Sequence, residues 1–133
     1  MVRAAGWDGR GGGPTTAEVD DAGAVDALAT RLLDSWASAS TLPGIELGEA
    51  PGATLSIWVA ADRWALVVTD ETFDQHCSQA DDAPDGSVDV SWGEPTPVPW
   101  TWFVDRAMAL SAVDRWLTDR TLAPEVEWCD RCD

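Results

Sequence analysis

The chain has 133 residues, 45% hydrophobic and 24% charged, a balance typical of a globular protein that can form a core without disulfides or metal. Its formal net charge of −16 disfavours nucleic acids, anionic membranes and acidic substrates as direct partners, and favours a basic protein surface. A need for solubility explains the same acidity equally well. The sequence shows neither a secretory signal nor a run approaching ~18 apolar residues, so we expect one cytoplasmic domain over residues 1–133.

The N-terminal part predicts two short strands and a helix. The strands are expected at 2–7 and 15–19, on either side of a glycine-rich loop at 8–14. That loop lacks the Gly-Lys-Ser/Thr of a phosphate-binding loop, which argues against a nucleotide site. A helix is expected over 21–36, because its apolar residues recur at helical spacing. These residues are Val25, Leu28, Ala29, Leu32 and Trp36.

The middle of the chain predicts strands joined by turns. A brief strand is expected at 45–47, and the alternating segments 55–59 and 64–69 predict an antiparallel hairpin with one apolar face on each strand. The stretch 70–86 is polar, acidic and rich in turn residues, so we expect a surface loop there. Alternation at 88–92 predicts one more strand, after which a segment with three prolines leads to the C-terminal helix.

The clearest element is an amphipathic helix that begins after Asp105. The Asp105 carboxylate suits an N-cap, because it can accept from the unpaired backbone N–H groups of the first turn. Pro124 prevents the helix from continuing, and 125–128 predicts a short closing strand. The apolar residues that form the stripe of this helix are Ala109, Ala112, Val113, Trp116 and Leu117.

These elements together predict an α+β fold, a mainly antiparallel sheet with two amphipathic helices packed on one face. Each helix has a single apolar stripe and each strand one apolar face, so packing the two layers together buries both. Trp36, Trp64 and Trp116 lie on these stripes and are expected in the core.

Metal, redox and catalytic chemistry receive little support. Cys129 and Cys132 have the C-x-x-C spacing of zinc ligands and redox pairs. His76 and Cys77 could complete a set of four ligands, which leaves a zinc protein or small metal-dependent enzyme as a distant alternative. The pair lies near the C-terminus and begins no helix, so we expect reduced thiols without metal or cofactor. No nucleophile motif accompanies the single histidine, so we expect no catalytic residue and no enzyme.

Acidic residues concentrate in and beside the stretch 70–86, close in sequence to several of the nine tryptophans. A charged rim around tryptophan anchors is typical of tight protein interfaces, because the rings supply affinity and the carboxylates steer association. The alternative is a solvated loop beside core tryptophans. The residues predicted to bind a partner are Asp70, Glu71, Asp74, Asp81, Asp82, Asp85, Glu94, Trp58, Trp92, Trp100 and Trp102.

The C-terminal third also resembles a known family. From Pro97 to Trp128 the chain has a proline-containing loop, a helix, a short connection with Pro124 and a terminal V-x-W strand. This order is similar to the close of the Imm1 family, small bacterial immunity proteins that neutralise toxin domains of polymorphic toxin systems. The order of the earlier elements is similar as well. Arg120 stands where such proteins often carry glycine, which takes the left-handed C-cap conformation without steric cost.

The Imm1 resemblance implies a protein that binds the C-terminal domain of a cognate toxin and blocks its active site or its access to substrate. The toxins linked to this family are often deaminases or nucleases. A toxin that handles nucleic acid usually presents a basic cleft, to which an acidic inhibitor is electrostatically matched. The alternative is an acidic adaptor or nucleic-acid-mimicking regulator without a toxin partner.

Overall fold

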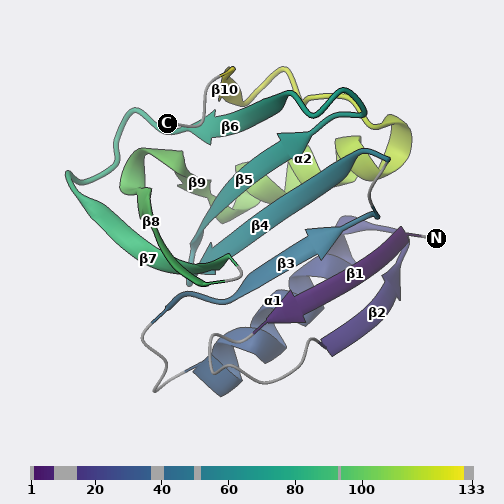
Figure 1. Cartoon of the computed structure of the whole chain (residues 1–133), viewed down its shortest axis with the longest axis horizontal. Coiled ribbons are helices and arrows are strands. Elements are labelled where there is room, and N and C mark those ends of the chain that lie inside the picture. Colours follow the sequence, from purple (N-terminus) through teal and green to yellow (C-terminus); the bar gives the residue numbers. More distant parts are fainter. Residues whose placement is uncertain (1, 8–14, 37–40, 50–51, 93, 131–133) are drawn as a thin grey trace.

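The computed structural model of the chain describes residues 2–7, 15–36, 41–49, 52–92 and 94–130. Over these residues, eight strands form one antiparallel sheet (Figure 1). The strands are β1 (Val2–Trp7), β2 (Thr15–Val19), β3 (Gly44–Leu47), β4 (Thr54–Ala60), β5 (Arg63–Thr69), β6 (Gln75–Gln79), β9 (Phe103–Asp105) and β10 (Glu127–Cys129). Their order across the sheet is β10-β6-β5-β4-β3-β1-β2, and β9 pairs with β5 beside this path.

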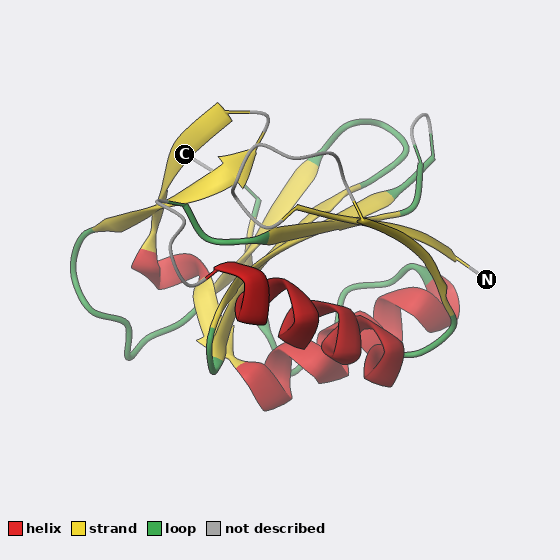
Figure 2. Ribbon diagram, turned by 90° about the horizontal axis from the view of Figure 1, so that it is seen from below, coloured by secondary structure: helices red, strands yellow, loops and turns green. Residues whose placement is uncertain are grey.

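Helices α1 (Ala22–Trp36) and α2 (Arg106–Asp119) cover the same face of this sheet (Figure 2). The Asp105 carboxylate accepts a hydrogen bond of 2.9 Å from the Met108 N–H, which confirms the predicted N-cap of α2. Asp21 accepts in the same way from the Ala24 N–H at the start of α1. The predicted α+β fold, with two helices on one face of an antiparallel sheet, is therefore confirmed.

The main core lies between the two helices and the sheet. The predicted stripes face it, because their apolar side chains are buried there with those of β3, β4 and β5. Leu117 is only half-buried, and the side chain of Trp36 lies outside the described part of the chain. Trp64 and Trp116 are core residues, as predicted. The stripe residues buried in this core are Val25, Leu28, Ala29, Leu32, Ala109, Ala112, Val113 and Trp116.

A second core lies on the opposite face of the sheet. There β7 (Ser87–Trp92) and β8 (Glu94–Pro99) form a hairpin, and the short 3-10 helix η1 (Trp100–Trp102) follows it. Figure 2 shows the hairpin on the side of the sheet away from the helices. Because both faces of β5 are covered, all its residues from Trp64 to Val68 are buried. The prediction that each strand has a single apolar face is therefore wrong for β5.

Two segments predicted as irregular are strands. The stretch 70–86 contains β6, which lies between β5 and β10 and pairs with both, so the prediction of one long loop is wrong. The proline segment forms β8, with prolines at Pro95, Pro97 and Pro99. Proline cannot donate to a strand ladder. β8 tolerates three of them because β7 is its one partner strand in the described structure.

The end of α2 shows how arginine replaces the expected glycine. Arg120 is the C-cap and has a left-handed backbone with φ of 62°. Its backbone N–H donates to the Trp116 carbonyl, and its guanidinium donates to the carbonyls of Trp116 and Leu117 at 2.9 and 2.8 Å. The guanidinium carbon also lies 4.5 Å from the centre of the Trp116 ring. These contacts offset the steric cost of the left-handed conformation.

The prediction of reduced thiols is wrong for Cys77. Cys77 is buried and disulfide-bonded, whereas Cys129 keeps its thiol. Cys132 lies outside the described residues. Across the same part of the chain, neither helix is long and apolar enough to cross a membrane.

Candidate functional site

The predicted acidic residues fall into two separate groups, because β6 runs between them (Figure 1). The acidic turn, Asp70–Asp74, joins β5 to β6, and the acidic loop, Ala80–Gly86, joins β6 to β7. β6 is five residues long, which at ~3.3 Å per residue sets the two groups ~16 Å apart. The predicted acidic residues of the stretch 70–86 therefore form two acidic surfaces, one at each end of β6.

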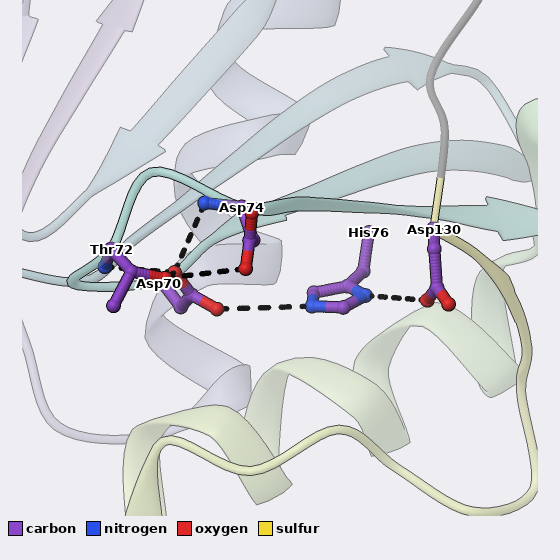
Figure 3. Close-up of polar contacts among 5 residues, drawn as sticks. All are labelled: Asp70, Thr72, Asp74, His76 and Asp130. Carbon is purple, nitrogen blue, oxygen red and sulfur yellow. Dashed lines mark hydrogen bonds and ion pairs between the residues drawn. The ribbon is translucent and has the colours of Figure 1, made fainter.

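The acidic turn is held by the side chain of Asp70 (Figure 3). Its carboxylate accepts hydrogen bonds from the backbone N–H groups of Thr72 and Asp74, at 2.9 and 3.0 Å, and from the Thr72 hydroxyl at 2.7 Å. The bond from the Thr72 hydroxyl is the main reason that the pKa of Asp70 lies below its ordinary value. Asp70 therefore shapes the turn, while Glu71 and Asp74 are exposed on it.

His76 links the acidic turn to the end of β10 (Figure 3). Its Nδ1 lies 3.0 Å from Oδ1 of Asp130, and its Nε2 lies 3.9 Å from Oδ2 of Asp70. The imidazole, whose side chain is 23% exposed, thus lies between two carboxylates from segments that are distant in sequence. The contacts orient the ring and join the two segments.

The proposed zinc set does not form. Cys77 is in a disulfide, so its sulfur is not the thiolate that binds zinc. No group of three or more His, Cys, Asp or Glu side chains that could hold a metal is found in the described part of the chain. A four-ligand site built from His76, Cys77 and the C-terminal cysteines is therefore wrong.

Beside the acidic loop lies a hollow of about 350 Å³, here named the acidic hollow. Arg63 forms an ion pair with Asp82 at 2.9 Å, and the hydrogen bond from Arg63 is the main cause of the lowered pKa of Asp82. The Ser111 hydroxyl donates to Glu125 and lowers the pKa of that carboxyl in the same way. The lining also includes apolar atoms of Val104 and Met108. Its carboxylates are those of Asp81, Asp82, Asp105, Glu125 and Glu127.

The acidic hollow suits a cationic side chain. Arg63 already pairs with Asp82, and the four other acidic residues of the lining attract an ammonium or guanidinium group. Val104 and Met108 can contact the aliphatic part of the same side chain. Sequence reasoning found Asp81 and Asp82 but missed the other three carboxylates. Asp105 is the N-cap of α2, and Glu125 and Glu127 belong to the C-terminal segment. The pairing of β10 with β6 brings this C-terminal segment to the acidic loop.

Two of the four predicted tryptophans are buried and not available to a partner. Trp58 and Trp102 are 2% and 5% exposed in the second core, so their prediction as exposed anchors is wrong. The physical reason is that the β7–β8 hairpin and η1 cover this face of the sheet. Trp100 is half-buried, and its ring centre lies 5.0 Å from that of Phe103. Its backbone N–H donates to the carbonyl of Gly86, the last residue of the acidic loop. The side chains of Trp92 and Glu94 lie outside the described part of the chain.

Phe73, in the acidic turn, was missed by sequence reasoning. It is 71% exposed and is the one exposed large hydrophobic residue among the residues that the structure describes. Its backbone is left-handed, with φ of 67°. The available signal was a single aromatic residue within the acidic run Asp-Glu-Thr-Phe-Asp.

The fold and these surfaces define an α+β protein with two helices on one face of its main sheet, a small hairpin on the other, and two acidic surfaces along one edge. No protein-family model matches the chain, and no curated protein matches its sequence. Membership of the Imm1 family therefore stays a prediction from the sequence pattern.

Proposed function

We propose that this protein is an immunity protein that binds the C-terminal domain of a cognate toxin and blocks the access of that domain to its substrate. The observation that carries the proposal is the acidic hollow, whose lining combines five acidic residues with the apolar residues Val104 and Met108. The net charge of −16 and the resemblance of residues 97–128 to Imm1 proteins support the same function.

In this proposal, an arginine or lysine of the toxin enters the acidic hollow. Its stem contacts Val104 and Met108, and its charged end meets the carboxylates. Toxins that act on nucleic acid bind phosphates with the same basic side chains, so occupying them competes directly with substrate. The partner is thus a deaminase or nuclease domain with a basic cleft, and the immunity protein contacts neither nucleic acid nor membrane.

Such an inhibitor acts in the cytoplasm, where the toxin meets nucleic acid. The disulfide at Cys77 is the feature that fits this compartment least, because cytosolic thiols are usually kept reduced. Cys77 is buried in the second core and is not among the residues that line the acidic hollow.

The test compares the kinetics of binding in two charge variants. The proposal predicts that a large toxin protein is encoded immediately upstream, and the probe is its C-terminal domain in a catalytically inactivated form. We expect the double variant Asp81→Asn, Asp85→Asn to associate at least several-fold more slowly at low salt, with little change in dissociation, because exposed charges act mainly on the encounter rate. Asp82 is left intact because it pairs with Arg63.

The matched control is Asp34→Asn, which removes an exposed charge from α1, on the other side of the molecule. Surface plasmon resonance at two salt concentrations gives both rate constants. Equal association rates for the double variant and the control would rule out binding through the acidic loop.

A further inference from the structure

Phe73 lies in the acidic turn, where neither packing nor backbone conformation favours phenylalanine. Its side chain is 71% exposed, so packing within the protein does not account for the ring. Its left-handed backbone, with φ of 67°, is costly for a bulky residue and favours glycine or asparagine. Both the solvent exposure and the backbone conformation therefore favour a different residue at this position.

The turn fixes the backbone from which the ring projects. The Phe73 N–H donates to the Asp70 carbonyl at 3.0 Å, and the Asp70 N–H donates to the Asp74 carbonyl at 3.0 Å. The Asp70 carboxylate accepts from the backbone N–H groups of Thr72 and Asp74, and His76 lies beside it. A backbone so tightly bonded needs little further ordering on binding, which favours affinity.

The surroundings of Phe73 indicate the chemistry of its partner. Glu71 and Asp74, its neighbours in the turn, are exposed. The acidic hollow lies at the other end of β6, ~16 Å away along the same edge of the sheet. A standard interface covers about 800 Å² of each partner, or roughly 30 Å across, so one interface is wide enough to include both features.

We propose that Phe73 is an anchor of the interface, inserted into an apolar pocket of the toxin domain that is rimmed by arginine or lysine side chains. This inference rests on the proposed function and adds a second contact to it. The ring supplies the resistance to dissociation, and the carboxylates of Glu71 and Asp74 meet the basic rim.

The experiment uses variants that suit the left-handed backbone. Phe73→Gly and Phe73→Asn remove the ring and relieve the strain, whereas Phe73→Trp keeps an aromatic ring. Each is bound to the inactivated toxin domain in surface plasmon resonance, and each melting temperature is measured by circular dichroism. We expect the glycine and asparagine variants to dissociate about 30-fold faster or more. We also expect them to melt at or above the wild-type temperature, and the tryptophan variant to keep most of the affinity.

The possible outcomes separate the two proposals. If the wild type binds and the glycine and asparagine variants dissociate at its rate, the proposed function stands and the role of Phe73 is refuted. If both variants melt well below the wild type, Phe73 is a structural residue and the inference also fails. If the wild type itself does not bind the domain, the proposed function and the anchor fall together.

Discussion

Ser78 is the fully buried polar side chain through which the second core is tied to the sheet. Its hydroxyl oxygen accepts from the Leu66 N–H at 2.9 Å, and its O–H donates to the Trp102 carbonyl at 2.6 Å. Its position explains the need. β5 pairs with β6 at Val67 and with β9 at Ala65, so the backbone of Leu66 lies where β5 changes partner. The hydroxyl takes the place of a strand partner there.

Replacing Ser78 with alanine leaves two buried backbone groups without that partner. Leu66 is 0% and Trp102 5% exposed, so water does not readily replace the hydroxyl. Each unsatisfied buried group costs about 1–3 kcal/mol, so we expect Ser78→Ala to lower the free energy of unfolding by ~2–4 kcal/mol. Ser87→Ala, at an exposed position in β7, is the control and should change it by less than ~0.5 kcal/mol.

Urea denaturation gives the free energy of unfolding of both variants. A change in stability appears as a shift of the midpoint urea concentration, while the slope of free energy against urea concentration stays the same. The same substitution should loosen η1, which also bonds the acidic loop through the Ala80 N–H to the Thr101 carbonyl at 2.7 Å. A Ser78→Ala variant as stable as the Ser87→Ala control would refute the role given to this hydroxyl.

Two further predictions concern the second core and the acidic turn. Trp58→Ala should lower the free energy of unfolding by ~3–5 kcal/mol, because the ring is buried, and a urea midpoint equal to that of the wild type would contradict its place in the core. Hydrogen bonding from Thr72 holds the folded pKa of Asp70 below its unfolded value. The resulting stabilisation is present at neutral pH and is lost as the pH falls below about 4. Between about pH 5 and pH 3, the melting temperature of Asp70→Asn should therefore fall less than that of the wild type. Parallel curves of melting temperature against pH for the two proteins would contradict this.

The parts of the fold with strong local signals could be predicted from the sequence. The stripes of α1 and α2 and the Asp105 cap depend on residues within a few positions of one another, as does the β4–β5 hairpin. β6 could not be found, because Gln75, His76 and Gln79 are polar and the strand forms only between β5 and β10. Its pairing is a long-range effect that overrides local propensity.

The site was predicted only in part, for the same reason. The acidic loop was visible as a charge run, but the hollow beside it needs Asp105 and Glu127, which come from the cap of α2 and from β10. In the alternating pattern of 55–59, Trp58 falls on the face opposite the main core, which predicts an exposed side chain. The β7–β8 hairpin, from a distant part of the chain, covers it. Phe73 has no stripe or motif, and only its exposure and backbone conformation distinguish it.

The most direct test of the central claim is protection of cells from the toxin. The active form of the toxin domain that the proposed function predicts immediately upstream is co-expressed with the wild type, with Asp34→Asn, or with a triple variant. In the triple variant Asp81, Asp85 and Phe73 are replaced by Asn, Asn and Gly. We predict survival with the wild type and with Asp34→Asn, and loss of protection with the triple variant although it remains folded. Cell death in the presence of folded wild-type protein would contradict the account.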